Sequence, residues 1–458
     1  MTLRSLGVVV LCQRAAVLRV TCRDMSAAAN PQTQSDFLRG KPHRKHPGVT
    51  NLKTLRLPQE LQIAAQSVIQ RAEVAELSER VRKLTNFLWS RKRLIEDVAL
   101  RKRAVNLEKE LWGKAMLTGP DVDEDLLNDR IRKKVLSELR RTTYHWTPLK
   151  YDEELGVVYM AARLAGGYAA VKRALHEIKK RDPSFAPQSL LDFGSGLGTV
   201  AWASHSYWGD SLKEMVCVDS SGSMNNLAER LLKGDDEGAA PHIKHVYFRQ
   251  FLPVSPKVQF DLVVSAFTLS ELPGVKDRED AVFTLWRKTS SYLVLVENGT
   301  KEGHQMLMEA RDALLKKQEK TVHDPRPASV FAPCPHELTC PKLTSQTAVP
   351  CNFLQFYQPL LLPGHHQSQT EKFSFLVLSR SRPAAAAEGV DWARLIAPVL
   401  RRTRHVHCRM CCPDGQLQHV VVTARKHSRD VYRCARSSDW GDQLPLIPNA
   451  QEDVSDSE

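Results

Sequence analysis

A short glycine-rich loop is the feature that most limits how this chain can fold. It reads LLDFGSGLGT over residues 190–199, and its apolar first half predicts a buried strand. Gly194, Gly196 and Gly198 would let the backbone turn tightly after that strand and approach a ligand closely. The loop therefore predicts a strand that passes directly into a helix beside a ligand site, which is a pattern of α/β folds.

The sequence after residue 188 supports this interpretation, because apolar strand-like runs alternate with helical segments, as in a doubly wound parallel sheet. The predicted strands are 189–194, 214–219, 245–250, 260–267 and 291–297, with a late strand at 372–380. The predicted helices between them are 199–208, 222–233, 277–290 and 302–320. A small-residue helix at about 152–181 precedes the first strand, and apolar residues at helical spacing from 61 to 117 predict a long helix before it.

Two acidic residues refine the interpretation of the loop. A dinucleotide site would have a third glycine where this chain has Thr199. Asp192 precedes Gly194 by two residues, and Asp219 ends the second predicted strand, where it could accept hydrogen bonds from ribose hydroxyls. Together these features resemble the class I S-adenosylmethionine (Rossmann-like) methyltransferase fold. NAD binding and a purely structural glycine turn are less favoured alternatives that stay open.

The segment where a methyltransferase would carry its catalytic residues is unusual. Residues 265–273 read SAFTLSELP and lack the Asn/Asp-Pro-Pro-aromatic motif that holds an exocyclic base amine. Phe267 could still stack on a base, and Glu271 could act as a general base or simply begin a helix. The Pro-Cys and Thr-Cys pairs typical of carbon-5 methylation occur only after the fifth strand. We therefore assign no catalytic residue.

Cysteines form a second pattern that an ordinary methyltransferase does not need. Cys334, Cys340 and Cys351 lie in a Pro-rich segment, and three further cysteines at 408, 411 and 412 follow about 60 residues later. Wide spacing and neighbouring prolines favour an iron–sulfur cluster, which takes four thiolates. Structural zinc usually shows two tight cysteine pairs, and here only residues 408 and 411 have that spacing. Three nearby histidines keep zinc open as an alternative, namely His336, His405 and His407.

Charge points to a polyanionic partner. The chain carries 65 basic and 52 acidic residues, for a net charge of +13. The basic residues gather in four clusters, at 41–46, 91–103, 130–141 and 401–436. Any one cluster could be a solvated helix face, but four together favour binding to a nucleic acid backbone.

The first residues resemble a targeting signal. Four arginines and no acidic residue precede Asp24, which is typical of a mitochondrial transit peptide and differs from the charged start and apolar core of a secretory signal. We therefore predict a protein of the mitochondrial matrix, where ten cysteines do not indicate a disulfide framework. No apolar run approaches the roughly 20 residues that span a bilayer, so no membrane partner is expected.

These observations give a predicted division of the chain. It comprises a transit peptide (1–23), a basic linker (24–54), an N-terminal helical region (55–150), a methyltransferase-like domain (151–324), a Cys-rich metal-binding segment (325–360), a late sheet strand with a basic C-terminal β-hairpin extension (361–440) and an acidic disordered tail (441–458).

Several motifs together resemble the mitochondrial small-subunit ribosomal family of methyltransferase-like proteins, over residues 55–440. The motifs are LLDFGSGLGT, VENGTKEG (296–303), CPHELTCP (334–341), PCNFLQF (350–356) and RHVHCRMCCPDG (404–415). One departure is Asn298, where many relatives have proline.

The resemblance implies a [4Fe–4S] cluster and an S-adenosylmethionine site. The family spacing of His-Val, four residues and Cys would make Cys411 the fourth cluster ligand after Cys334, Cys340 and Cys351, with Cys408 and Cys412 still open. The cofactor site would carry over to Asp192, Gly194, Gly196 and Asp219.

The leading functional hypothesis is therefore an rRNA-binding assembly factor of the small mitochondrial ribosomal subunit, bound as a monomer and built on an inactive methyltransferase scaffold. The alternative is an active, S-adenosylmethionine-dependent rRNA methyltransferase. A radical or redox enzyme is disfavoured, because four protein ligands would leave no iron open to a substrate.

Overall fold

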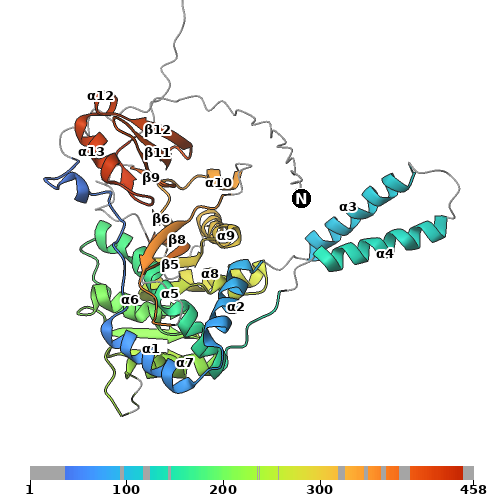
Figure 1. The fold of residues 1–458 in the computed structure, drawn as a ribbon, viewed down its shortest axis with the longest axis horizontal. Helices are drawn as coiled ribbons and strands as arrows, with labels where there is room; N and C mark the ends of the chain where they lie inside the picture. The colour runs from blue at the N-terminus through green and yellow to red at the C-terminus, as the bar shows by residue number, and fades with distance from the viewer. Residues whose placement is uncertain are drawn as a thin grey trace, which may run out of the picture.

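The fold consists of a large sheet covered by helices, a smaller C-terminal sheet and a projecting helical hairpin (Figure 1). The computed structural model describes residues 37–92, 97–116, 124–142, 146–234, 236, 238–255, 257–317, 325–344, 349–362, 368–380 and 392–446. The predicted transit peptide and the last 12 residues of the predicted acidic tail lie outside the described residues.

The large sheet confirms the predicted mixed α/β class. Its strand order is β3-β2-β1-β4-β5-β8-β6, with β7 paired to β8. The first five strands are parallel, and β8 runs antiparallel to β5. In chain order the strands are β1 (Ser189–Phe193), β2 (Glu214–Val218), β3 (Val246–Arg249), β4 (Phe260–Ala266), β5 (Thr289–Asn298), β6 (Ala328–Ala332), β7 (Phe353–Tyr357) and β8 (Gln369–Arg380). The predicted late strand at 372–380 is confirmed as part of β8.

Helices cover both faces of this sheet, because alternate strand residues point to opposite sides. Leu190 packs into the core under α5 (Glu153–Arg181), α6 (Thr199–Trp208) and α7 (Gly222–Leu232). The next residue, Leu191, packs into the core under α8 (Val275–Arg287) and α9 (Lys301–Lys317). The near-continuous apolar strands of the sequence are thus explained by burial on two sides.

The N-terminal helical region is more divided than the sequence indicated. The single long helix predicted between 61 and 117 is wrong, because Glu73 and Glu76 adopt left-handed backbone conformations (φ 44° and 49°) that separate two helices. These helices, α1 (Gln59–Ala72) and α2 (Leu77–Ser90), bury apolar residues against α5.

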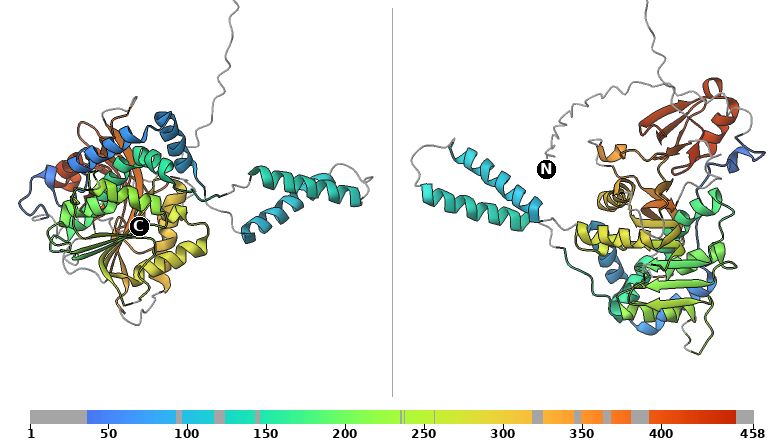
Figure 2. Two further views of the ribbon diagram at one scale, coloured as in Figure 1. Left: turned by 90° about the horizontal axis from the view of Figure 1, so that it is seen from below. Right: turned by 180° about the vertical axis from the view of Figure 1, so that it is seen from behind.

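The remaining two N-terminal helices form an arm. α3 (Asp97–Met116) and α4 (Glu124–Thr142) lie side by side and project away from the rest of the molecule (Figures 1 and 2). Most of their basic side chains are exposed. The region predicted as one domain at 55–150 therefore contains two parts: α1 and α2 pack against α5, whereas α3 and α4 project from the molecule.

A second sheet occupies the C-terminal region. It has the order β10-β11-β9-β13, with β12 paired to β11. The elements are β9 (Ala393–Leu395), β10 (Leu400–Arg401), β11 (Val406–Cys411), β12 (Leu417–Val422), α12 (Ala424–His427), α13 (Arg429–Ser437) and β13 (Gln443–Leu444). The predicted hairpin is confirmed as β11–β12, with Gly415 at φ 78° in its turn. The predicted boundary of a disordered tail at 441 is wrong, because Asp442, Leu444 and Leu446 are buried.

Residues 43–57, which we call the N-terminal strap, pack along the C-terminal sheet and the edge of the large sheet. The strap begins with the short helix η2 (His43–Lys45). The Thr50 amide donates to Asp442 Oδ1 at 2.7 Å, and the Leu55 amide donates to the Phe356 carbonyl at 2.9 Å. The predicted linker at 24–54 is therefore incorrect for its described residues, which are held in place by the end of the chain.

The Cys-rich segment also has more regular structure than its prolines suggested. It contains β6, which joins the large sheet, and the short helix α10 (Pro341–Thr344). Among the described helices none is long and apolar enough to cross a membrane.

Candidate functional site

The glycine loop after β1 has the tight geometry predicted from the sequence. Gly194, Gly196 and Gly198 all have positive φ, at 73°, 49° and 69°. A Cβ atom on Gly194 would lie 2.1 Å from Thr268 Oγ1, so the loop passes directly against the end of β4. Only glycine fits that position, both for its backbone conformation and for its space.

The two predicted acidic residues flank this loop in different ways. Asp192 is fully buried in β1, and neither of its carboxylate oxygens has a hydrogen-bond partner. Burial raises the pKa of Asp192 well above its ordinary value, and Asp219 adds to the effect. Asp219 instead accepts hydrogen bonds from the amides of Gly196 and Ser221, each at 2.9 Å, and so fixes the loop to the end of β2.

A cavity opens beside the loop, between α5 and the ends of β1 and β4. It is lined by Tyr159, Arg163, Gly167, Val171, Gly194, Ser195, Gly196, Leu197, Thr199, Val200, Ala266 and Phe267. A glycine loop, apolar walls and a buried carboxylate in the strand just before the loop are features expected of a nucleotide-cofactor site. Of the four predicted cofactor residues, Gly194 and Gly196 line the cavity, Asp192 lies two residues before Gly194, and Asp219 accepts from the Gly196 amide.

The wall of this cavity at the end of β4 is occupied by a buried ion pair. Arg163 donates to Glu371 Oε1 at 3.0 Å and to Asn298 Oδ1 at 3.2 Å. Its guanidinium also lies over the Phe267 ring, 4.8 Å from the centroid. One face of the ring that could have stacked on a base is therefore covered by a cation. This contact could not be predicted from local sequence pattern, because Arg163 and Glu371 lie more than 200 residues apart.

Glu271, the other residue considered for catalysis, has a structural partner. It forms an ion pair with the buried Arg91 at 2.6 Å and accepts from the Tyr151 hydroxyl at 3.3 Å. Glu297 at the end of β5 was not identified from the sequence. It is fully buried, accepts from the Ser270 amide at 3.2 Å, and has its pKa raised to about 7 by burial.

The four predicted metal ligands surround a second, smaller cavity between the two sheets. Cys334, Cys340, Cys351 and Cys411 all line it, together with His336, Lys342, Arg394 and Leu417. Three of these cysteines come from the connections between β6 and β7, and the fourth comes from the end of β11. We call these four residues and their cavity the cysteine centre.

Successive side chains along β11 point to opposite faces of the sheet, and this separates the three candidates for the fourth ligand. Cys408 and Cys412 are fully buried in the apolar core of the C-terminal sheet. Cys411 points to the other face, where its thiol lies 3.3 Å from His336 Nε2. Its pKa is raised by burial and then by the nearby thiols of Cys334, Cys351 and Cys340. The geometry therefore favours the predicted Cys411 over its two neighbours.

Burial makes the thiols of Cys334, Cys351 and Cys411 difficult to ionise without a positive partner. It raises the pKa of Cys351 to about 12 and raises that of Cys334 as well, although Arg311 partly opposes the second shift. His304, which was not identified from the sequence, lies 3.7 Å from the Cys340 thiol. His405 and His407 were candidate zinc ligands in the sequence, but they do not line this cavity.

Two buried arginines connect the cysteine centre to the rest of the fold. Arg311 on α9 lies 3.8 Å from the Cys334 thiol and also donates to the Leu338 carbonyl. Arg394 on β9 donates to the Pro333 carbonyl at 3.0 Å and pairs with Glu177 on α5 at 2.8 Å. Both guanidinium groups are almost fully buried.

Within the described ranges, no group of three or more His, Cys, Asp or Glu side chains lies close enough together to hold a single metal ion. The four thiols surround a cavity and do not converge on one point.

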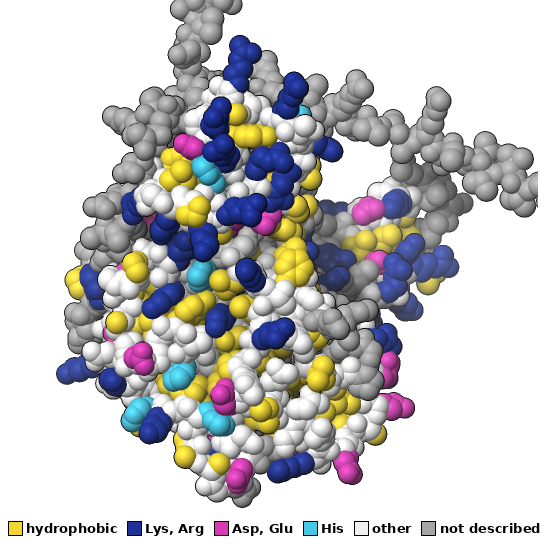
Figure 3. Space-filling model, turned by 60° about the vertical axis from the view of Figure 1, so that its left-hand side comes forward, with side chains coloured by type: hydrophobic (Ala, Val, Ile, Leu, Met, Phe, Trp, Pro, Cys, Tyr) yellow, Lys and Arg dark blue, Asp and Glu magenta, His cyan; other side chains and the backbone are white. Residues whose placement is uncertain are grey.

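In the folded chain the four basic clusters form two surfaces, because contacts bring residues near its two ends together. His43 pairs with Asp430 on α13 at 2.8 Å, which brings the 41–46 cluster beside the 401–436 cluster. We call this combined region the C-terminal basic surface, and Lys and Arg side chains crowd the upper part of the molecule there (Figure 3). The other two clusters lie mainly on the α3–α4 arm, although Arg91 is buried and does not contribute.

Comparison with known proteins identifies relatives over most of the chain. The family model described as "Mitochondrial small ribosomal subunit Rsm22" matches residues 153–445. The chain is 53% identical to the Homo sapiens protein "Ribosome assembly protein METTL17, mitochondrial" over 430 residues, covering 93% of this chain and 91% of that protein. It is 27% identical to the Schizosaccharomyces pombe "Rsm22-cox11 tandem protein 2, mitochondrial" over 64% of this chain and 44% of that protein.

Solved structures give weaker matches. A magnesium protoporphyrin IX methyltransferase from Synechocystis is 13% identical, covers 57% of this chain and 100% of its own, and has a TM-score of 0.31. A ribosomal protein L11 methylase from Lactobacillus delbrueckii is 14% identical, covers 46% and 77%, and has a TM-score of 0.28. These values add nothing to the fold already described.

Proposed function

Because the chain belongs to the mitochondrial small ribosomal subunit Rsm22 family, we propose that it is an assembly factor of the small mitochondrial ribosomal subunit. It binds rRNA in the mitochondrial matrix through the C-terminal basic surface and the α3–α4 arm. The family match supports the assembly role, and the collection of four basic clusters into two exposed surfaces supports RNA as the partner.

The glycine-loop cavity is proposed to bind S-adenosylmethionine. Asp192, Gly194, Gly196 and Asp219 would hold it: the two glycines line the cavity, Asp219 fixes the loop through the Gly196 amide, and the Asp192 carboxylate beside the loop has no hydrogen-bond partner. The bound cofactor would carry the methyl group and would also stabilise the α5 and β4 walls that enclose it.

Methyl transfer is not part of the proposed function. A base entering beside β4 would need an open aromatic face and a hydrogen-bond acceptor for its amine. Instead, the Phe267 ring is covered by Arg163, which is held by Glu371, and opening this pair would leave a buried charge unpaired. The single observation that favours an inactive scaffold is this buried Arg163–Glu371 pair.

The cysteine centre is proposed to bind a [4Fe–4S] cluster through Cys334, Cys340, Cys351 and Cys411. The four thiols fit such a group because they share one cavity, and burial raises the pKa of Cys334, Cys351 and Cys411, so that these three need positive charge to ionise. The cluster would supply metal–thiolate bonds that fasten β11 to the connections after β6, and so fix the C-terminal basic surface to the large sheet.

Co-sedimentation tests the main proposal. The tagged protein is expected to migrate with small-subunit precursors in gradients of mitochondrial lysate, and its removal is expected to lower the amount of mature subunit. A protein that migrates free of these particles while assembly is under way would contradict the assembly role.

A separate measurement addresses the enzyme alternative. The Asp192→Asn variant should lose cofactor binding without altering any methyl mark on the small-subunit rRNA, as judged by mass spectrometry of rRNA fragments. Loss of one mark with assembly intact would instead establish a methyltransferase.

A further inference from the structure

The outward face of the β11–β12 hairpin carries an unusual set of side chains. Along β11 the residues Val406, Cys408 and Met410 point into the apolar core of the C-terminal sheet. The alternate positions His405, His407 and Arg409 therefore point outward. On β12, His419 lies directly opposite Arg409 and shares this face, which we call the histidine face.

The three imidazoles of the histidine face contact one another. His407 Nδ1 lies 3.1 Å from His419 Nε2, and the two rings are stacked with centroids 5.2 Å apart and planes 26° apart. The His405 ring packs edge-on against His407 at 5.0 Å. The antiparallel pairing of β11 with β12 therefore holds the imidazoles side by side, and it orders them more than solvated side chains on a loop would be ordered.

Cations surround these rings. Arg402, Arg404 and Arg409 are all exposed. The pKa of His407 is lowered by partial burial and then by His419, His405, Arg402 and Arg409, which act in the same direction. These four neighbours all disfavour a further positive charge on His407, and a bound polyanion would relieve that repulsion.

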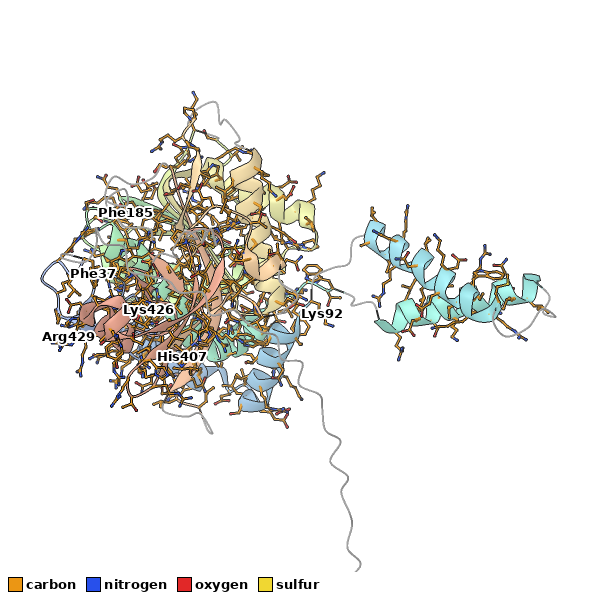
Figure 4. The ribbon with its side chains drawn as sticks, turned by 90° about the horizontal axis from the view of Figure 1, so that it is seen from above. Phe37, Lys92, Phe185, His407, Lys426 and Arg429 are labelled. Carbon is orange, nitrogen blue, oxygen red and sulfur yellow. The ribbon has the colours of Figure 1, made fainter. Side chains whose placement is uncertain are left out.

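Other exposed cations of the C-terminal region lie on other elements. Lys426 is on α12 and Arg429 is on α13, whose apolar residues pack on the core-facing side of β11. Lys92 lies far from His407, where the α3–α4 arm leaves the body (Figure 4). The histidine face is therefore the part of the C-terminal basic surface that combines ring surfaces with cations.

We propose, building on the assembly function above, that the histidine face binds single-stranded RNA, with unpaired bases stacking on the imidazoles and phosphates pairing with Arg402, Arg404 and Arg409. Partly exposed rings bordered by arginines match the way proteins hold unpaired nucleotides. A duplex would not use the rings, because its base faces are hidden within the helix. An acidic protein surface would need the arginines but not the stacked imidazoles.

The position of Cys411 links this face to the cysteine centre. Cys411 is two residues beyond Arg409 and points to the same side of β11, where the strand enters the cavity. A strand held at that end presents its imidazoles in a fixed register. The cysteine centre thus supports RNA binding through the strand, without touching the RNA itself.

Binding to defined oligonucleotides tests the proposal. The full-length protein, purified without oxygen, is titrated into fluorescein-labelled oligoadenylate of about 12 nucleotides and into a duplex of the same length. His405→Ala/His407→Ala/His419→Ala should weaken oligoadenylate binding by roughly tenfold for each stacked base that is lost, with at most a twofold effect on the duplex. Lys244→Ala removes an exposed cation beyond the opposite edge of the large sheet and should change neither affinity.

A second variant separates stacking from charge. His407→Phe/His419→Phe keeps two rings but cannot bind protons. Phosphate next to an imidazole raises its pKa, so wild-type affinity should increase as the pH falls from about 7.5 to about 6. The Phe variant should keep its affinity at the higher pH and lose much of that increase.

Two outcomes would overturn the inference. One is unchanged oligoadenylate binding by the triple Ala variant, and the other is an equal loss for single strand and duplex. Iron content and circular dichroism of each variant establish that its fold is intact. If the wild-type protein fails to co-sediment with the small subunit, the assembly function is refuted. If it co-sediments normally but the triple variant binds oligoadenylate as well as wild type, only the role of the histidine face is refuted.

Discussion

The glycine-loop cavity and the cysteine centre are both built to hold a ligand, but they are constructed in opposite ways. The glycine loop is a continuous piece of chain between β1 and α6, and its shape is fixed by hydrogen bonds from its amides to the Val218 carbonyl and to Asp219. The cysteine centre combines two separate regions of the chain and two sheets, and much of its lining comes from connections between strands. The first site is shaped by its own backbone, whereas the second depends on long-range contacts.

This difference indicates where a bound group matters for folding. A preformed loop should survive the loss of its cofactor with little change in stability. The cysteine centre should not survive the loss of the metal that we propose it binds, because metal binding to such a site contributes directly to folding free energy. The following substitutions test this contrast, in order of decreasing effect on stability.

Cys411→Ser should have the largest effect. We expect most of the bound iron and sulfide to be lost, together with several kcal/mol of stability, because a cluster ligand and a buried thiol are removed. Cys408→Ala is a matched control on the same strand, and it should keep the iron and cost only about 1 kcal/mol for a small cavity. Metal analysis and a visible spectrum after anaerobic purification measure both. Zinc without iron, or equal iron loss in the two variants, would contradict the assignment.

Glu177→Gln tests the connection between the two sites through α5. Its carboxylate pairs with Arg173 at 3.0 Å and Arg394 at 2.8 Å, and all three side chains are almost fully buried. Removing the charge leaves two buried guanidinium groups unpaired, so we expect a loss of about 3–5 kcal/mol in urea unfolding.

Glu177 should also make stability sensitive to acid. Burial alone would raise its pKa, but Arg394 and Arg173 outweigh burial and hold the pKa well below its ordinary value. A carboxyl with a depressed folded-state pKa contributes stability that is complete above its unfolded pKa, about 4.3, and is lost as the pH falls below that value. The Gln variant should lack this part of the acid dependence. An unchanged acid dependence would show that the pair does not hold the sheets together.

Gly194→Ala and Gly196→Ala test the rigidity of the glycine loop. A methyl group on Gly194 would overlap Thr268 in a left-handed backbone, whereas one on Gly196 would meet only Met224 Cε at 3.6 Å. We expect a loss of about 3 kcal/mol for the first and about 1 kcal/mol for the second in thermal unfolding. Similar values for both variants would mean that the loop relaxes and is not preformed.

Asp192→Asn should have the smallest effect on stability and the opposite sign. Because burial raises the folded-state pKa of Asp192, its contribution to stability is present at low pH and is lost as the pH rises through that pKa. The neutral variant should therefore be more stable by about 1 kcal/mol near neutral pH, with a difference that shrinks in acid. Titration calorimetry with S-adenosylhomocysteine should show no binding. A destabilised variant that still binds the cofactor analogue would exclude Asp192 from the site.

The sequence was most informative where local pattern decides structure. The parallel strands, the glycine loop and the β11–β12 hairpin follow from hydrophobic alternation and turn residues, and each was predicted within a few residues. The predicted helix at 277–290 begins and ends earlier, at 275 and 287, because β5 already begins at Thr289. The predicted cysteines lie together as well, since thiols are easily recognised by type.

The residues that complete each site could not be inferred from pattern. Arg163, Arg311 and Arg394 look like ordinary surface arginines in the sequence, and only the fold buries them beside Phe267 and the cysteine centre. The position of the N-terminal strap could not be inferred either, because Thr50 bonds to Asp442, about 390 residues further along the chain. Short polar segments carry little local signal, and their structure is decided by distant hydrogen bonds.

The meeting of the strap with the final strand has a consequence for synthesis and quality control. Gly48 lies so close to the Gln443 backbone that even a Cβ atom would overlap it, and Asp442 caps the amides of Thr50 and Asn51. The N-terminal strap therefore cannot make these contacts until residues near the C-terminus have been imported. A chain that ends prematurely, even by twenty residues, would leave both ends unpaired and would be open to proteases, so only complete molecules should reach the ribosome.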